Sequence, residues 1–351
     1  MSTSPLVSVC VPTYNGAQYL RVCLDSILSQ TLTDFEVLIV DDCSTDETLV
    51  IATEYAQRDK RIRFVKNERN LGLVGNWNRC VELAEGEWIK FVFQDDLIAP
   101  HCVESLMQAV QPGDAFVFCR RDFLFADNTP EPTRRYYRSK MELVANHFPR
   151  AGRYTAEQFC TVALTRVGDN FVGEPTAVML HRELFERFGN FNPHLIVSCD
   201  VEYWTRVGIH VGCVHVPECL ATFRVHAGGT SAVSRANRKY RMRVLDDLLM
   251  LHEAAYAPLY APLRKVASRQ QPPVSLARAF RKKARWAYGV AVQAARDPVQ
   301  PDDSLIREWD HVAAHFARLR SIPWHYGFSC WRNKWAGQIV ALLRCKREGR
   351  H

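Results

Sequence analysis

The sequence predicts an α/β protein, in which a mostly parallel sheet carries helices on both faces and a basic helical region follows. Three observations predict it. Short runs of apolar, largely β-branched residues alternate with segments of helical spacing over the first hundred residues. Polar and acidic residues follow the runs directly, at strand ends where open α/β sheets bind ligands. Hydrophobic residues make up 47% and charged residues 24% of the 351 residues, the balance of a folded globular chain.

The predicted strands of the first half are nearly continuous apolar runs, as expected for strands that are buried on both faces. They lie at 6–11, 35–40, 61–65 and 87–93. Helices are predicted between them at 17–29, at 73–84, and after Ser44, where Ser44-Thr45-Asp46-Glu47 forms a capping box. Strands that alternate with helices in this way form a parallel sheet.

The second half of the chain is less regular. Residues 127–140 hold two prolines and several arginines and are predicted to form a surface loop. Order returns with an apolar piece at 177–180, helices at 182–188 and near 200–208, and a strand pair around 213–225. Gly189 is expected to end the first of these helices.

The formal net charge of +7 is unevenly distributed. Residues 1–231 carry 22 Lys and Arg against 29 Asp and Glu, whereas residues 232–351 carry 23 against 9. This change of sign predicts a first domain over 1–231 and a basic helical region over 232–351. Basic and aromatic residues share helical segments of the second region, which is typical of binding to an anionic membrane surface. An ordinary solvated helix face is the alternative.

Several classes of protein are disfavoured by what the sequence lacks. The twelve cysteines include no Cys-x-x-Cys pair, so a structural zinc site is not expected. The dinucleotide, P-loop, zinc-protease and nucleophile-elbow motifs are absent. Nucleic acid is not an expected partner, because no recognition motif accompanies the basic charge. No secretory leader is recognised, so reduced thiols and a cytoplasmic location are expected, with the protein peripheral on the inner membrane face if the basic region binds lipid.

Adjacent aspartates follow two of the predicted strands. Asp95 and Asp96 come after the fourth run, where buried carboxylates need a cation or hydrogen bonds, and oxygen ligands of this kind suit Mg²⁺ or Mn²⁺ on substrate phosphates. A solvated turn is the alternative, but the place at a strand end favours a site. Asp41 and Asp42 follow the second run, and Asp42 either accepts hydrogen bonds from a nucleobase or favours a helix N-terminus.

Two further residues are candidates from the second half. Asp200 stands at the predicted start of a helix, as an N-cap aspartate or as a general base beside the first site. His226 follows a strand and precedes the flexible run Ala227-Gly228-Gly229-Thr230-Ser231, which could close over a ligand. A satisfied structural histidine is the alternative for His226.

Together these motifs resemble family 2 glycosyltransferases of the GT-A fold, from about Val7 to Ser231. The resemblance rests on the order and spacing of short pieces, each weak singly. They are Val7 to Asn15, Ser26 to Thr31, Phe35 to Asp46, Asn70-x-Gly72 with Asn78, Gly86 to Ile89 leading into Asp95-Asp96, Gly189-Asn190-Phe191, Asp200 with Trp204 and Arg206, and Arg224-x-His226.

The resemblance implies an inverting transferase that moves a sugar from a nucleoside-diphosphate sugar, with UDP as the expected nucleotide, to a hydroxyl of a glycan or lipid-linked acceptor. Asp200 would be the general base, and a divalent metal, Mn²⁺ or Mg²⁺, would be held by Asp96, with His226 completing the metal site or the closing loop. The implied donor-binding residues are Pro12, Tyr14 (stacked on the base), Asn15, Asp42 (bonded to the base), Asn70, Gly72, Asn78 and Asp95 (on the ribose).

Three positions depart from the family pattern. Gln94 stands where the metal motif often begins with an acidic residue, Trp77 where an arginine often directly precedes the asparagine of the third motif (here Asn78), and Cys199 where an acidic residue often precedes the base. Two other functions remain as alternatives. A nucleotidylyltransferase of sugar-nucleotide metabolism would need a glycine-rich basic loop after the first strand, which is lacking, and a non-catalytic nucleotide-sugar-binding protein would be expected to lose Asp96 or Asp200.

Overall fold

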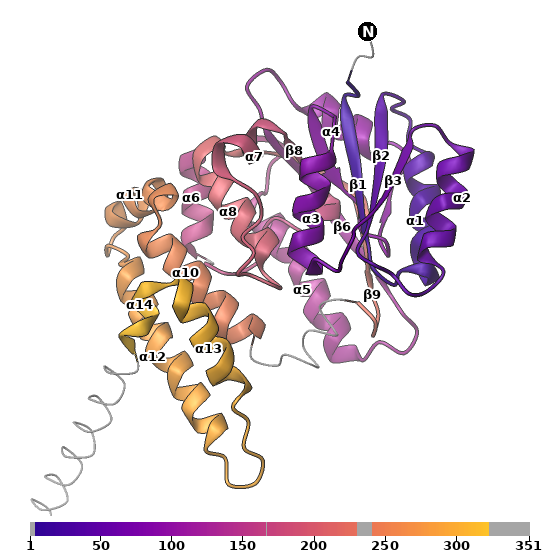
Figure 1. Ribbon diagram of the computed structural model, residues 1–351. Coiled ribbons are helices and arrows are strands. Elements are labelled where there is room, and N and C mark those ends of the chain that lie inside the picture. The colour runs from indigo at the N-terminus through magenta and orange to yellow at the C-terminus, as the bar shows by residue number, and fades with distance from the viewer. Residues whose placement is uncertain (1–3, 166, 230–240, 323–351) are drawn as a thin grey trace, which may run out of the picture.

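A computed structural model describes residues 4–165, 167–229 and 241–322, and within them the strands form one nine-stranded sheet (Figure 1). The strands are β1 (Val7–Thr13), β2 (Phe35–Asp41), β3 (Ile62–Lys66), β4 (Trp88–Phe91), β5 (Leu97–Ile98), β6 (Phe116–Phe125), β7 (Gly152–Tyr154), β8 (Val178–His181) and β9 (Cys213–Val225). The helices of the first two segments are α1 (Ala17–Leu28), α2 (Thr48–Arg58), α3 (Gly72–Leu83), α4 (Cys102–Ala109), α5 (Glu131–His147), α6 (Ala156–Thr165), α7 (Glu183–Phe188) and α8 (Cys199–Val211).

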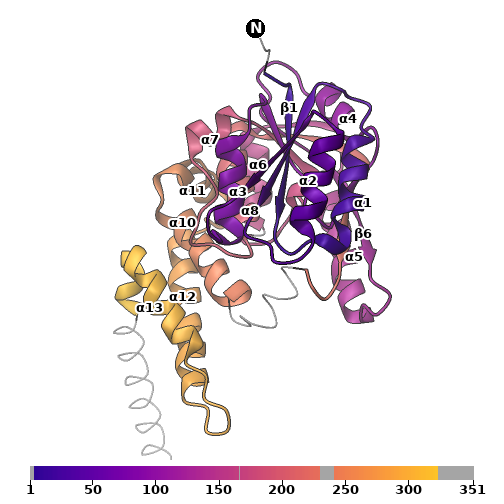
Figure 2. The ribbon, with the colours of Figure 1, turned by 45° about the vertical axis from the view of Figure 1, so that its right-hand side comes forward.

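The third segment is helical. It contains the π-helical turn Arg241–Asp246, α10 (Asp247–Tyr256), α11 (Ala261–Arg269), α12 (Leu276–Ala295), α13 (Ser304–His315) and α14 (Ala317–Arg320). Helix α12 and the connection from it to α13 extend away from the sheet (Figure 2). No helix among the described residues is long and apolar enough to span a membrane.

The strand order is β3-β2-β1-β4-β8-β6-β9-β5, with β7 paired to β9. Strands β3, β2, β1 and β4 are parallel, which confirms the predicted parallel sheet, and β8 runs antiparallel to both β4 and β6. Because parallel strands end at the same edge, the residues that follow β1, β2 and β4 meet there.

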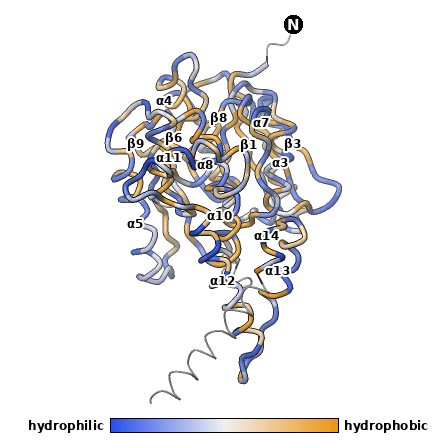
Figure 3. Tube along the Cα trace, turned by 90° about the vertical axis from the view of Figure 1, so that its left-hand side faces the viewer, coloured by the Kyte–Doolittle hydropathy of each residue, from blue (hydrophilic) through white to orange (hydrophobic). Residues whose placement is uncertain are grey.

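Alternate strand residues supply the two hydrophobic layers. Val9 and Val37 face helices α1, α2 and α4, whereas Cys10 and Leu38 face α3 and the layer that contains α8. The second layer also contains buried residues of α10–α14, so one continuous apolar cluster joins the sheet to the C-terminal helices. Figure 3 shows the apolar positions distributed along both parts of the trace. The predicted boundary at 231 falls among residues that the structure does not describe.

Three expectations were wrong in detail. The capping box predicted at Ser44 does not form, because the Ser44 hydroxyl donates to Asp41 and α2 begins only at Thr48. The predicted loop over 127–140 is mostly helix α5, because Pro132 is tolerated in the first helical turn and Tyr137, Met141 and Val144 repeat at helical spacing toward β6. The predicted strand pair at 213–225 is the single strand β9, whose pairing with β6 shifts register at Arg120. Such irregularities accommodate a proline within a strand, here Pro217.

Candidate active site

The turn after β1 is held by side chains from two other strand ends. Asn15 has a positive φ of 48°, a conformation that asparagine tolerates, and its Oδ1 accepts from the Thr45 amide at 2.8 Å. Gln94 receives the Tyr14 amide at 2.9 Å and donates to the Tyr14 carbonyl at 3.1 Å. Tyr14 is 51% exposed. The turn therefore presents an accessible aromatic ring on a fixed backbone, while Pro12 lies buried in the strand before it.

Asp42 is buried and organises the loop that follows β3. Its carboxylate accepts from Asn67 Nδ2 at 2.9 Å and from the amides of Leu71 and Gly72 at 2.7 and 2.9 Å. Asn70 donates to its backbone carbonyl at 3.0 Å. The structure thus brings the predicted residues Asp42, Asn70 and Gly72 together.

Two asparagines of α3 point to different partners. Asn76, which the sequence reasoning missed, lies between strands β1 and β2 and donates to the Val40 carbonyl at 3.0 Å. Asn78 exchanges two hydrogen bonds with the backbone of Phe191, at 2.9 and 3.0 Å. Both polar atoms of the Asn78 side chain are engaged there, and its predicted contact with the donor stays a prediction.

The carboxylate that contacts His226 is that of Asp95 and not that of Asp96. The pairing of β5 with β9 places the residues just before Leu97 beside the end of β9. Asp95 Oδ2 lies 2.9 Å from His226 Nε2, and the His226 ring packs edge-on against Tyr19. Arg224 donates from Nε to the Asp95 carbonyl at 2.9 Å. Asp95 and His226 are both partly accessible.

Asp96 is fully buried beneath this pair. Its carboxylate accepts from the Arg224 amide at 2.9 Å and from the Thr176 hydroxyl. Burial, together with the nearby Asp95 carboxylate, raises the pKa of Asp96 well above its usual range. A buried carboxylate with so little compensating charge is the setting in which a bound cation would be favourable.

Asp200 begins α8 and is also buried. Its Oδ1 accepts from the Val201 amide at 2.8 Å. Burial raises the pKa of Asp200 to about 7; the nearby Glu174 carboxylate adds to the rise, and Arg121 opposes it. A carboxylate with a pKa near neutrality is suited to take up a proton from a hydroxyl at the operating pH.

The segment 173–176 links these acidic groups and was not singled out from the sequence. Glu174 forms an ion pair with the buried Arg121, Thr176 Oγ1 donates to Asp96, and the Gly173 carbonyl accepts from Trp204 Nε1 at 3.0 Å. The buried Lys90 side chain donates to the Thr176 carbonyl. Gly173 has a φ of 145°, and a Cβ there would approach Arg121 Cδ to 3.4 Å. The only sequence signal was a Gly-Glu-Pro-Thr run before a predicted strand.

The residues present fit a divalent cation that takes some of its ligands from the protein and the others from a substrate. Among the residues that the structure describes, no three His, Cys, Asp or Glu side chains are grouped so as to hold a metal alone. Asp95, Asp96 and His226 nevertheless supply carboxylate oxygens and an imidazole at one strand end. Magnesium-type sites commonly use one or two carboxylates and take their remaining ligands from phosphates and water.

Comparisons with known proteins identify the family of the chain. The family described as Glycosyl transferase family 2 matches residues 8–187. An uncharacterized protein of Mycobacterium tuberculosis is 32% identical over 253 residues, which are 70% of this chain and 76% of that protein. Among solved structures, the mannosyltransferase PcManGT from Pyrobaculum calidifontis in complex with GDP-Man and Mn²⁺ has a TM-score of 0.54 at 19% identity, over 95% of this chain and 88% of that chain.

A second solved structure has the same fold. It is S. aureus TarS 1–349 in complex with UDP-GlcNAc, with a TM-score of 0.53 at 17% identity, over 90% of this chain and 83% of that chain. The family match and the fold of these neighbours therefore define a glycosyltransferase of the GT-A fold. The chain belongs to glycosyl transferase family 2 and is a transferase.

Proposed function

We propose that the protein is an inverting glycosyltransferase that uses a UDP-sugar and transfers the sugar to a hydroxyl of a glycan or lipid-linked acceptor. The observation that carries this proposal is a buried carboxylate, Asp200, with a pKa of about 7. Trp204 of the same helix donates to the Gly173 carbonyl, and Thr176 of the same segment donates to Asp96. The proposed site thus has a proton acceptor on α8 and an acidic cation site after β4. The family match favours sugar transfer over nucleotidyl transfer.

The proposed reaction is a single displacement. The acceptor oxygen forms a bond to the anomeric carbon, the bond from that carbon to the diphosphate oxygen breaks, and Asp200 takes the hydroxyl proton. A divalent cation, when bound by Asp96 with Asp95 or His226, would offset negative charge on the departing diphosphate. With one carboxylate base and no second carboxylate as nucleophile, the expected outcome is inversion, by analogy with glycosidases.

The donor is the finer part of the proposal. Tyr14, with its exposed ring and fixed backbone, is suited to stack on a base, and Asp42 lies within the adjoining loop. One structural neighbour is complexed with UDP-GlcNAc and another with GDP-Man and Mn²⁺, which supports a nucleoside-diphosphate sugar as the donor class. UDP is the proposed nucleotide; because a carboxylate can accept from the N–H groups of uracil, thymine and guanine alike, the nucleotide panel decides among them.

A thermal-shift panel tests the donor class. UDP, GDP, dTDP, CMP and ATP are each added with Mn²⁺, with Mg²⁺ or with EDTA. A ligand at about 100 times its Kd should stabilise the fold by about 2.7 kcal/mol. We expect UDP to stabilise the protein, and only with metal. Stabilisation by another nucleotide alone would replace UDP in the proposal, and no stabilisation by any nucleotide would overturn it.

Replacing Gln94 by glutamate is expected to weaken UDP binding by up to about tenfold, the effect of about one hydrogen bond. A carboxylate can still accept from the Tyr14 amide but cannot donate to the Tyr14 carbonyl, which would face a negative charge. Titration calorimetry with UDP measures the change. Gln108→Glu, on the exposed face of α4, controls for the added charge. Unchanged or tighter UDP binding by Gln94→Glu would contradict the holding role of Gln94.

We also propose that the protein docks on an anionic membrane surface, and the basic face of α12 supports this. Helix α12 contains no acidic residue, and its exposed side chains are Arg278, Arg281, Lys282, Arg285, Trp286 and Gln293, with Trp286 50% exposed. Among the described residues, none of the four cations has an ion pair with a carboxylate. Such a stripe matches a basic amphipathic helix with an aromatic anchor. The other stretch in which the sequence combines basic and aromatic residues, with Trp324, Trp331, Trp335 and Arg344 to Arg347, lies outside the described residues.

Reversing two charges on this face is expected to weaken membrane binding. Each basic residue near an anionic surface contributes about 1 kcal/mol, so Arg281→Glu with Lys282→Glu should lower the affinity at least about 30-fold. Flotation with phosphatidylglycerol–phosphatidylcholine vesicles measures it. Arg58→Glu with Lys60→Glu, at the end of α2, makes the same charge change elsewhere. Equal loss in both variants would indicate a non-specific charge effect, and no loss would refute docking through α12.

A further inference from the structure

The loop that leads into Asp200 is held by a buried carboxylate of the C-terminal region. Asp246 ends the π-helical turn before α10 and has no exposed surface. Its Oδ2 accepts from the amides of Ile196, Val197 and Ser198 at 3.2, 2.7 and 3.2 Å. These three residues directly precede the first turn of α8, in which Asp200 is the second residue.

This contact satisfies amides that have no partner in the helix itself. The amide of Ser198, the N-cap residue, has no partner within the helix, and the amides of Ile196 and Val197 in the loop need an acceptor because backbone N–H groups away from water must be paired. A carboxylate at this end also interacts favourably with the helix dipole, and hydrogen bonds to an ionised acceptor are about twice as strong as neutral ones. Asp246 therefore fixes both the path of the loop and the place where α8 begins.

A second polar contact fixes α8 two residues beyond Asp200. Glu202 is buried and accepts from the Tyr260 hydroxyl at 2.8 Å, and it forms a two-point ion pair with Arg206 at 3.0 Å for each bond. Arg206 in turn donates to the Asn190 carbonyl at 2.8 Å. Tyr260 precedes α11, so this link also comes from the C-terminal helices.

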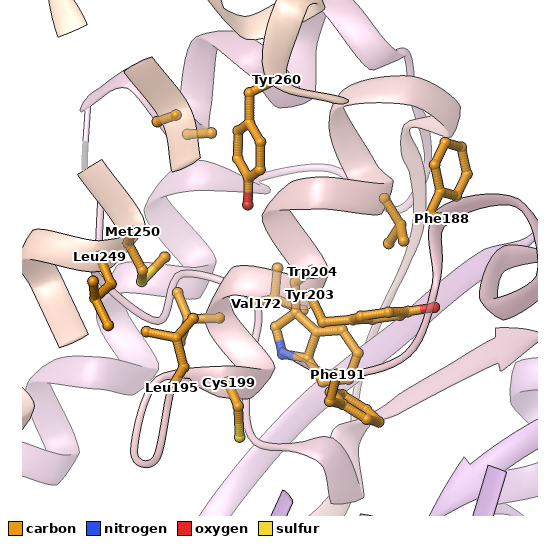
Figure 4. Packing of buried hydrophobic residues seen from close by; sticks show 14 of the residues in the cluster. Val172, Phe188, Phe191, Leu195, Cys199, Tyr203, Trp204, Leu249, Met250 and Tyr260 are labelled. Atoms are coloured by element: carbon orange, nitrogen blue, oxygen red, sulfur yellow. The ribbon is translucent and has the colours of Figure 1, made fainter. Parts of the chain in front are cut away.

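Apolar packing surrounds the two polar contacts. Figure 4 shows Leu195, in the loop before α8, beside Leu249 and Met250 of α10. These three residues and Cys199 are buried members of one cluster. The loop before α8 thus lies beside α10, and Asp246 directly precedes that helix.

We propose that Asp246 is a positioning residue for the transfer reaction, acting through Asp200. By this proposal the C-terminal helices form part of the catalytic unit, because they set the place of the base. The proposal rests on the proposed role of Asp200. A displacement of about 1 Å at a reacting group can lower the rate about 10²-fold, so loss of this anchor is expected to affect turnover more than donor binding.

The test is a double-mutant cycle in the full chain. Asp246→Asn is expected to lower kcat by about 10- to 100-fold while the Kd for UDP with Mn²⁺ stays unchanged. Asp246→Ala should show the same split if it folds. Asp247→Asn is the matched control, since this neighbouring carboxylate pairs with Lys283 at 3.0 Å instead of with the loop, and its kcat should stay near wild type.

The cycle separates positioning from a purely structural role. In an Asp200→Asn background, Asp246→Asn should produce no further loss, because a residue that acts through Asp200 has nothing left to position. Equal losses in both backgrounds, or a lower melting temperature with unchanged kcat per folded molecule, would overturn the proposal. If Asp200→Asn itself retains full turnover, the proposed base fails, and a kcat loss in Asp246→Asn would then have another cause.

Discussion

Replacing Asp200 by asparagine is expected to lower kcat by about 10²- to 10⁴-fold, the usual contribution of a general base. The amide cannot take up the acceptor proton, but it has nearly the same shape and can still accept from the Val201 amide. UDP binding, measured by calorimetry with Mn²⁺, should be unchanged because the donor-binding residues lie on other elements. Turnover is measured as UDP release in the presence of acceptor. Full turnover by Asp200→Asn would show that another group is the base.

Asp200→Asn should also change how kcat/KM depends on pH. Since burial raises the pKa of Asp200 to about 7, the ionised, proton-accepting form prevails above pH 7, and kcat/KM should fall about tenfold per pH unit below it. This fall of kcat/KM below pH 7 should be absent in Asp200→Asn. The raised pKa means that the protonated form favours folding at low pH and that this advantage is lost as the pH rises through about 7. The variant should therefore be more stable than the wild type at pH 8, with little difference at pH 4.

Replacing Asp96 by asparagine is expected to abolish metal-dependent UDP binding and to reduce turnover by about 10²- to 10⁴-fold, since a divalent cation contributes several kcal/mol. The fold should survive, because an amide can accept from the Arg224 amide while donating to Thr176 Oγ1. The Asp96→Asn substitution also removes a buried negative charge. Calorimetric titration of UDP with Mn²⁺ and with EDTA measures the change.

Asp127→Asn, at an exposed position, is the control for Asp96→Asn. Two further variants decide which side chains hold the metal. If metal-dependent binding persists in Asp96→Asn but is lost in Asp95→Asn and His226→Ala, the cation is held by the Asp95–His226 pair, and Asp96 has only a structural role. Persistence in all three variants would refute a metal site at this strand end.

Much of the first half could be predicted from the sequence because its signals are local. An apolar run followed by polar residues identifies a buried strand and its end, and four such runs predicted β1 to β4. The place after the second run selected Asp42, and the family resemblance added Asn70 and Gly72; the structure brings the three together. Helix α5 was missed because two prolines in a polar stretch are typical of a loop, whereas the helical spacing of Tyr137, Met141 and Val144 decides it.

The contacts between distant elements could not be read in this way. Glu174, Arg121 and Asp246 meet the site from positions that no short motif marks. Their role depends on which strand neighbours which, and the antiparallel insertion of β8 between β4 and β6 brings segment 173–176 to Asp96. The partner of His226 likewise follows from the pairing of β5 with β9.

Segment 173–176 has a consequence for how this family member can vary. Its residues make contacts to Asp96, Arg121, Trp204 and Lys90, each through a different atom of a four-residue stretch. One inserted or deleted residue would shift every contact at once, whereas surface loops tolerate changes of length at small cost. We therefore expect functional homologues to differ in this segment by substitution. The number of residues between Gly173, whose carbonyl accepts from Trp204, and β8 should stay constant.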